Sequence, residues 1–283
     1  MDYLEIQIES PPQNFETISN LLFLYGIKTI LEEDNSLKFY LPEEEWGTIE
    51  NLDEELMSKG LTSKSGFHVR KFENKNWNEE WEKSIKPIDI NNKIVIHTSW
   101  NSSEIENPED KILIQIDPKM AFGTGHNETT RLVLELMQEF LNGNESSLLD
   151  YGCGTGILAI AGIKLGVDSA IAIDIDLEAI DNAREYTKAN EAESKITFYQ
   201  SNISEIEEDE FDIICANIIS SVIKDNIDYM KSKLNKNGKL FLSGILIEEE
   251  AQIVDMLKTN DFLVKKILHK AEWLGIYANL NTN

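Results

Sequence analysis

Glycines at alternate positions are the first feature of this sequence that could bind a ligand. Gly152, Gly154 and Gly156 follow a short apolar run that ends at Asp150, and an apolar helical run starts at Ile157. Glycines allow backbone conformations and close approaches that a Cβ atom forbids. The start of a helix offers free N–H groups and the positive end of the helix dipole. The pattern therefore predicts a strand, a tight turn and a helix that hold a small polar ligand against bare backbone.

Two polar side chains end further predicted strands. Asp174 ends the run AIAID, 20 residues after Gly154, and Asn217 follows the run FDIICA. Ligands bind at the carboxyl ends of the strands in open parallel sheets, so we expect both residues to join the glycine turn in one site. Asp174 can accept bonds from both hydroxyls of a ribose, whereas Asp176 is expected to start the next helix. The amide oxygen of Asn217 can accept a bond from an amine, and the plainer alternative is a helix cap.

Two cofactor classes fit this turn. The run GTGILA matches a loose dinucleotide-binding pattern, which predicts a nicotinamide cofactor. The carboxylate of Asp150 would sit poorly beside a pyrophosphate and favours a ligand with a cationic part. S-adenosylmethionine is such a ligand, because it has a ribose, a sulfonium and an ammonium but no phosphate. Ile218 and Ile219 follow Asn217, and these aliphatic neighbours favour an aliphatic amine over a planar base or amide as the second reactant.

A second glycine turn precedes the first by about 30 residues. It lies in DPKMAFGTGHNETT, positions 117–130, and the amphipathic run that follows predicts a helix. Two glycine turns that each feed a helix favour one shared ligand site over a purely structural region.

The elements that must position these residues alternate between strand and helix from Leu148 onward, which predicts a doubly wound, mostly parallel sheet. The predicted strands are 148–151, 170–175, 195–199, 211–216 and 239–243, with helices at 156–165, 177–190, 218–235 and 247–259. Runs 263–269 and 273–280 predict an antiparallel pair at the sheet edge, and 93–97 and 111–116 predict earlier strands.

A smaller α+β domain is predicted before this one. Residues 1–72 show the order β-α-β-β-α-β of a ferredoxin-like sandwich. The expected strands are 3–8, 28–32, 37–41 and 66–72, and the expected helices are 14–24, capped by Asn14, and 42–59. Trp77, Trp81 and Ile85 recur every four residues, so 73–87 is expected to be a helical linker before the domain at 88–283.

Composition limits the partners and the compartment. The 283 residues carry a net charge of -25, which repels nucleic acid and anionic membranes and favours a basic protein or cationic substrate. High solubility is the plainer explanation of that charge. We expect no membrane span, signal peptide or metal site, because long apolar runs, a basic leader and metal-ligand spacing are absent from the sequence. The two cysteines, Cys153 and Cys215, cannot form a framework of bridges, which favours the reducing cytoplasm.

The motifs LLDYGCGTG, IDID and CANI, with the final strand pair, resemble the class I S-adenosylmethionine-dependent methyltransferases. The stretches DPKMAFGTGHNETTRL and NWNEEWEKSIKP resemble one family of that class much more specifically, the ribosomal protein L11 methyltransferases (PrmA). This resemblance covers nearly the whole chain. It implies a seven-stranded Rossmann-like methyltransferase domain that follows a small substrate-recognition domain.

The resemblance also implies roles for individual residues. Asn217 would be catalytic, beside the methyl group and the incoming amine. The cofactor would be held by Thr130, Gly152, Gly154, Gly156, Asp174, Asn217 and Asp150, with Phe122, Gly123 and Thr124 as a nearby wall. In one departure from the family's usual pair of residues, His126 is followed here by Asn127.

The resemblance implies direct in-line methyl transfer to lysine side chains and the N-terminal α-amine of free ribosomal protein L11, by a monomer that makes no direct contact with nucleic acid. The alternatives are methylation of another protein lysine or small amine and, less favoured, a nicotinamide-dependent oxidoreductase.

Overall fold

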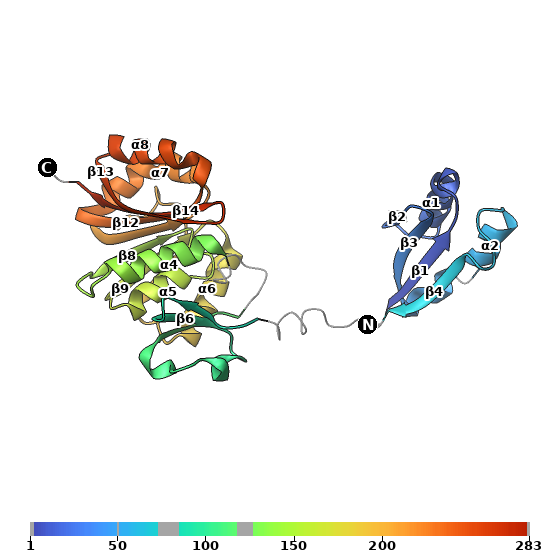
Figure 1. Cartoon of the computed structure of the whole chain (residues 1–283), viewed down its shortest axis with the longest axis horizontal. Helices are drawn as coiled ribbons and strands as arrows, with labels where there is room; N and C mark the ends of the chain where they lie inside the picture. The colour runs from blue at the N-terminus through green and yellow to red at the C-terminus, as the bar shows by residue number, and fades with distance from the viewer. Residues whose placement is uncertain (1–2, 50, 73–84, 118–126, 282–283) are drawn as a thin grey trace. The chain divides into compact units, whose positions relative to one another are not determined.

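The structure is a computed structural model that describes residues 3–49, 51–72, 85–117 and 127–281. The chain divides into two compact units, residues 1–83 and 84–283, each with its own core (Figure 1). Most of the expected helical linker, 73–84, lies outside the described residues, so the division at 72 and 87 stays a prediction.

The first unit contains an antiparallel sheet with the strand order β2-β3-β1-β4. Alternate residues of the first strand, Leu4, Ile6 and Ile8, are buried against the helices, while their neighbours face outward. The elements are β1 (Tyr3–Glu9), η1 (Pro12–Asn14), α1 (Phe15–Leu24), β2 (Leu31–Glu33), β3 (Ser36–Pro42), η2 (Glu43–Thr48), α2 (Leu52–Ser58) and β4 (Phe67–Phe72).

Two expectations for this unit are wrong. The single helix over 42–59 is instead a 3-10 helix, η2, and a short α-helix, α2. Gly47 lies in η2, and glycine inside a helix is costly because it has more backbone freedom to lose. Asn14 does not cap α1: its backbone is already helical, and its amide donates to the Ser10 hydroxyl at 3.0 Å. A capping side chain needs an extended backbone at that residue.

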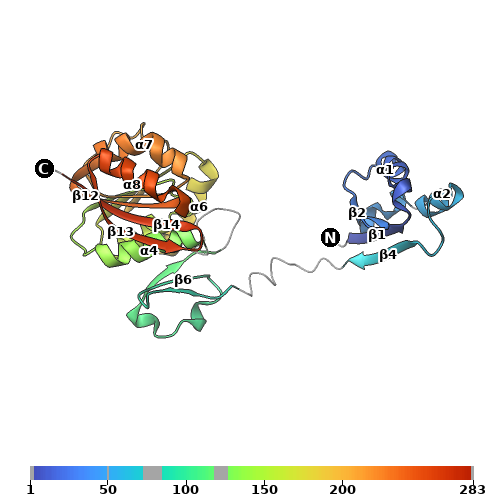
Figure 2. The ribbon, with the colours of Figure 1, turned by 45° about the horizontal axis from the view of Figure 1, so that its top comes forward.

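The second unit is built on a mostly parallel sheet with the strand order β10-β9-β8-β11-β12-β14-β13 (Figures 1 and 2). Its elements are β8 (Ser147–Tyr151), α5 (Ile157–Lys164), β9 (Ser169–Asp174), α6 (Leu177–Ala189), β10 (Ile196–Gln200), β11 (Phe211–Asn217), α7 (Ser220–Lys233), β12 (Leu234–Leu246), η5 (Ile247–Glu249), α8 (Glu250–Thr259), β13 (Phe262–Lys270) and β14 (Trp273–Leu280). The pair β13 and β14 is antiparallel, as predicted.

Shorter elements precede this sheet. They are β5 (Ile88–Ile90), β6 (Ile94–His97), η3 (Ser102–Glu104), η4 (Pro108–Asp110), β7 (Ile112–Gln115) and α4 (Glu128–Phe140). The strands β5, β6 and β7 form a small sheet of their own. Among the described residues, no helix is long and apolar enough to cross a membrane, and no group of three or more His, Cys, Asp or Glu residues could hold a metal ion.

Helices cover both faces of the large sheet, which explains why its strands are continuous apolar runs. Buried residues of α4, α5 and α6 pack on the face that receives Leu148, and buried residues of α7 and α8 pack on the face that receives Leu149. Because successive side chains of a strand point to opposite faces, Asp150 lies on the same face as Leu148, beneath α5.

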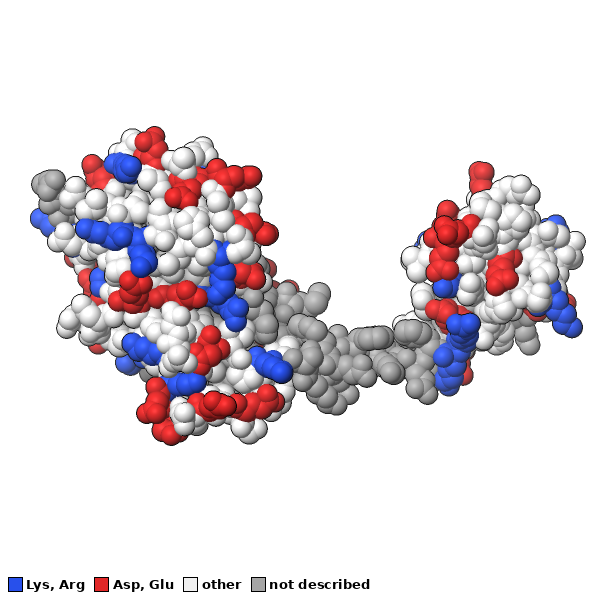
Figure 3. Space-filling model, viewed as in Figure 1, with Lys and Arg blue, Asp and Glu red and all other residues white. Residues whose placement is uncertain are grey.

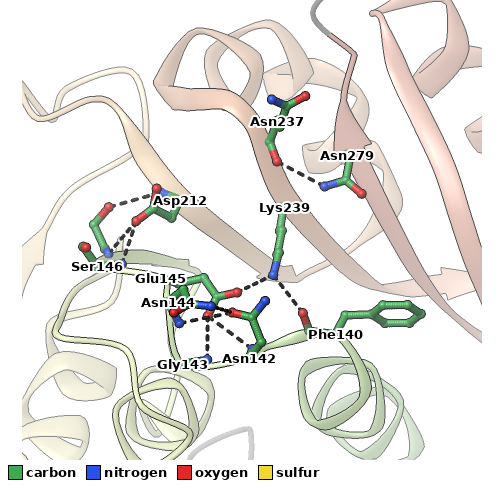
Figure 4. A network of polar contacts seen from close by, with 11 residues as sticks. Phe140, Asn142, Gly143, Asn144, Glu145, Ser146, Asp212, Asn237, Lys239 and Asn279 are labelled. Atoms are coloured by element: carbon green, nitrogen blue, oxygen red, sulfur yellow. Dashed lines mark hydrogen bonds and ion pairs between the residues drawn. The ribbon is translucent and has the colours of Figure 1, made fainter.

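An ion pair and its hydrogen bonds join β12 to the loop between α4 and β8 (Figure 4). Lys239 pairs with Glu145 and donates to the Phe140 carbonyl at 2.8 Å. The other carboxylate oxygen of Glu145 accepts the Gly143 amide at 3.1 Å. Burial alone would raise the pKa of Glu145, but the bond from Lys239 and backbone N–H groups hold that pKa below its usual value.

Lys239→Gln should therefore destabilise the second unit. The Glu145 side chain is only 6% exposed, and its charge would lose its cation, so we expect the free energy of unfolding to fall by about 3 kcal/mol at neutral pH. The pair stabilises the fold above the usual pKa of glutamate, and this contribution is lost as the pH falls through the depressed folded value. Urea unfolding should show the gap between wild type and variant shrinking in acid.

The matched control is Lys266→Gln. Lys266 pairs with Glu139 at 3.5 Å, and both side chains are more than 40% exposed, so the loss should stay below about 1 kcal/mol. Equal losses in the two variants would contradict the assignment of the first pair as a buried one.

Candidate active site

The glycine turn after β8 is fixed to the neighbouring strand by its own backbone. Gly152, Gly154 and Gly156 all have positive φ, at 72°, 53° and 73°. The amides of Gly152 and Cys153 both donate to the Ile173 carbonyl, at 2.9 and 3.0 Å. The turn therefore lies at the carboxyl end of β9, in a backbone conformation that residues other than glycine rarely adopt.

Asp174 ends β9 and bonds directly to the turn. One carboxylate oxygen accepts the Gly154 amide at 3.0 Å and the other accepts the Asp176 amide at 3.1 Å. Asp176 caps α6 by accepting the Glu178 amide at 2.9 Å, which confirms that it starts this helix. Backbone bonds thus hold the Asp174 carboxylate in place, and its free lone pairs can accept further donors.

Asn217, at the end of β11, presents a polar atom without a partner. Its amide nitrogen donates to the Thr130 hydroxyl of α4 at 3.2 Å. Its Oδ1 is buried and has no hydrogen-bond partner among the described residues. Asn217 does not cap the following helix, because α7 begins at Ser220 with Ile219 as its cap residue. A buried acceptor left unpaired costs free energy, so this oxygen suits a donor supplied by a ligand.

These strand ends surround a cavity of about 540 Å³. Four of the predicted site residues line it, namely Gly152, Gly154, Asp174 and Asn217. The other lining residues are Asn127, Glu128, Thr129, Tyr151, Ile175, Ile218, Ile219, Val222, Gly244 and Trp273. Thr130 is not among the lining residues; it is fully buried and accepts a bond from Asn217, which does line the cavity.

Asp150 and Gly156 lie behind the turn, outside this lining. Asp150 is 1% exposed, and its Oδ2 accepts the Ala159 amide of α5 at 3.0 Å. Burial raises the pKa of Asp150 to about 7, although the bond from Ala159 opposes this. A Cβ atom on Gly156 would lie 3.2 Å from Ala183 of α6. Asp150 thus supports α5, and Gly156 allows close packing on α6; their proposed contacts with a cofactor stay predictions.

The predicted wall residues Phe122, Gly123 and Thr124, and also His126, lie outside the described residues.

Several lining residues were missed by sequence reasoning. Thr129 has a buried hydroxyl without a partner, and Glu128 is a carboxylate at the first position of α4. Gly244 has a φ of 80°, and a Cβ atom there would lie 2.2 Å from the Ile218 carbonyl oxygen. The one available signal for this residue was a glycine directly after a predicted strand, which often marks a bulge; β12 does change register between Leu242 and Ile245.

Comparison with known proteins agrees with this geometry. The family model described as "Ribosomal protein L11 methyltransferase (PrmA)" matches residues 2–281. The L11 methyltransferase of Chlorobaculum parvum is 34% identical over 97% of this chain and 95% of its own, and that of Alkaliphilus oremlandii is 29% identical over 99% of both. The crystal structure of a ribosomal protein L11 methylase from Lactobacillus delbrueckii subsp. bulgaricus has a TM-score of 0.64 and 29% identity, covering 70% of this chain and 100% of that one.

The mostly parallel sheet, the glycine turn after β8 and the acid at the end of β9 suit one class of enzyme, the S-adenosylmethionine-dependent methyltransferases, and the matched family assigns the chain to that class. The chain belongs to one family of this class, the ribosomal protein L11 methyltransferases. The family and the cofactor class predicted from the sequence are thereby confirmed, and the nicotinamide-dependent alternative is set aside.

Gly244→Ala adds only one methyl group but should disturb the cavity wall. The new Cβ would meet the Ile218 backbone at 2.2 Å and would need a positive φ, so the cavity wall must shift. We expect a lower melting temperature and weaker binding of S-adenosylhomocysteine, measured by differential scanning fluorimetry and calorimetry. Gly47→Ala is the control, because a Cβ there meets nothing within 4 Å. Unchanged binding in Gly244→Ala would contradict the close approach.

Proposed function

We propose that this protein transfers methyl groups from S-adenosylmethionine to amino groups of free ribosomal protein L11, on lysine side chains and on the N-terminal α-amine. Membership of the family supports the substrate. The observation that carries the chemistry is the unpaired, buried Oδ1 of Asn217 at the cavity. An amine is a donor that can satisfy this oxygen, and its remaining lone pair is then directed away from the bond.

The described residues fit the cofactor. When bound, S-adenosylmethionine supplies a methyl group on a positively charged sulfur. Asp174 would accept bonds from the ribose hydroxyls, and Gly152 and Gly154 would lie along the methionine part. The absence of a side chain on Gly152 lets Ile218 pack against the turn, since a Cβ atom there would lie 2.3 Å from the Ile218 side chain. The buried Thr129 hydroxyl is a second polar atom that awaits a partner.

Asn217 would act by orienting the amine. A lysine ammonium has a pKa of about 10.4 in water and must lose a proton before its nitrogen can attack. The apolar lining residues Ile218, Ile219 and Val222 would desolvate the ammonium, and the nearby sulfonium charge would repel it, so both lower its pKa. The remaining requirement is in-line alignment, which can lower a barrier by roughly 7–11 kcal/mol.

We further propose that residues 1–72 form a ferredoxin-like domain that holds the protein substrate. The strand order β2-β3-β1-β4, with one helix after β1 and one after β3, supports this fold. A net charge of -25 suits a basic target. On the face of the second unit seen in Figure 3, acidic and basic side chains are interspersed, so attraction would act through the summed field rather than through one patch.

Asn217→Ala tests the chemistry. With L11 and isotopically labelled S-adenosylmethionine, we expect kcat to fall by about 100-fold because the amine loses its orienting acceptor, while calorimetry shows a much smaller change in cofactor affinity. Asn226→Ala is the matched control. The Asn226 side chain donates to the Val222 carbonyl of its own helix, and kcat of this variant should stay within about twofold of wild type. Mass spectrometry of L11 identifies the modified amines.

If wild-type enzyme leaves L11 unlabelled and labels a different protein or a small amine, the substrate proposal fails and the methyltransferase assignment stands.

Deletion of residues 1–72 tests the domain proposal. The second unit has its own core, so we expect the shortened chain to bind S-adenosylhomocysteine within about threefold of wild type, as for an independent domain. Methylation of L11 should be lost. Full L11 methylation by the shortened chain would contradict a substrate-holding role for this domain.

A further inference from the structure

Two neighbouring strand ends form the part of the cavity around Asn217. Residues 217–219 run from the last residue of β11 into the loop before α7, and Gly244 lies in β12, which pairs with β11 through Asn217 and Ser243. The two segments touch directly, because a Cβ atom on Gly244 would lie 2.2 Å from the Ile218 carbonyl oxygen. The position of Asn217 therefore depends on how these segments are held together.

Glu249, at the end of η5, bonds to residues that closely follow both segments. Its Oε1 accepts the Ser220 hydroxyl at 2.5 Å and the Lys224 ammonium at 2.9 Å, both from α7. Its Oε2 accepts the Leu246 amide at 3.3 Å, at the end of β12. Ser220 directly follows the cavity residue Ile219, so one residue links this carboxylate to the cavity wall.

The start of α7 has few other polar contacts that could do this work. Among the described residues no side chain caps the helix, and the amides of Val222 and Ile223 donate to the Ile219 carbonyl within the first turn. A carboxylate beside a helix start also interacts favourably with the helix dipole. The bonds from Ser220 and then Lys224 hold the pKa of Glu249 below its usual value, so it is ionised at neutral pH.

We propose that Glu249 is a positioning residue for methyl transfer: it ties the first turn of α7 to the end of β12 and thereby fixes Asn217 relative to the cofactor. Glu249 is not among the residues that line the cavity, so it acts through the segment 217–220. This inference rests on the proposed role of Asn217 toward the amine, and its test separates the two.

Glu249→Ala removes all three bonds, whereas Glu249→Gln keeps an oxygen for Ser220 or Leu246 and loses the ion pair. A shift of about 1 Å at a reacting group can cost about 100-fold in rate. We therefore expect kcat on L11 to fall by about 10- to 100-fold in Glu249→Ala and by less in Glu249→Gln. The affinity for S-adenosylhomocysteine should stay within about threefold of wild type, because Asp174 and the glycine turn are untouched.

Glu250→Gln is the matched control. Glu250 is the next residue, and its carboxylate contacts His269 of β13 at 2.7 Å, away from segment 217–220. Its kcat should equal that of wild type. A fall of the same size in both variants, or a Glu249→Ala enzyme with normal kcat and only a lower melting temperature, would overturn the proposal.

Hydrogen exchange supplies a readout that does not need L11. The amides of Val222 and Ile223 should exchange at least about tenfold faster in Glu249→Ala than in Glu250→Gln, because the first turn of α7 loses its tether. Unchanged exchange would overturn the tether itself. Faster exchange in an enzyme whose wild type leaves L11 unmethylated would uphold the tether and remove only its link to the proposed function.

Discussion

The site depends on close contact between bare backbone segments at the carboxyl edge of the large sheet. Ile218 is pressed between two glycines, with its side chain over Gly152 and its carbonyl against Gly244. Both glycines have positive φ, so neither position tolerates a side chain without a shift of its neighbour. This packing brings the ends of β8, β11 and β12 close enough to share one cavity, and the contacts of Asp174, Asn217 and Glu249 are all made around it.

Some polar atoms at this edge are held by hydrogen bonds, and others are buried without a partner among the described residues. Asp174 is held by two backbone amides, and Asn217 is held through its nitrogen by Thr130. By contrast, the oxygens of Asn217 and Thr129 lack partners among the described residues. A side chain that is held at one end and unpaired at the other suits a binding site. The ligand then meets an acceptor that is already oriented.

Much of this arrangement could be predicted from the sequence, because strands buried on both faces appear as continuous apolar runs and ligands collect at their carboxyl ends. That reasoning brought Gly152, Asp174 and Asn217 together correctly. It could not find Gly244, whose constraint comes from a contact with Ile218 that only the folded sheet creates. The alternation of strand side chains turns the Asp150 carboxylate toward α5, where it accepts the Ala159 amide, and its expected place beside the ligand stays a prediction.

Two predictions for the first unit are wrong, and both were based on local sequence alone. An acidic, helix-favouring run over 42–59 is divided into η2 and α2, and Asn14 bonds Ser10 instead of capping α1. The residue types in 42–59 and at Asn14 are compatible with the expected helix and cap. The observed backbone conformation differs from the one that each role requires. Backbone conformation at a single residue depends on packing that is distant in sequence, which pattern alone does not contain.

The strand β14 brings a residue from the last part of the described chain to the cavity. It is inserted between β12 and β13, and because it runs antiparallel to β12, its first residue, Trp273, reaches the cavity. A strand that is paired on both sides, and one residue of the cavity wall, thus come from the last part of the described chain. During synthesis the glycine turn and Asp174 emerge long before this wall, so a nascent chain has the parts of a cofactor site before it can enclose one.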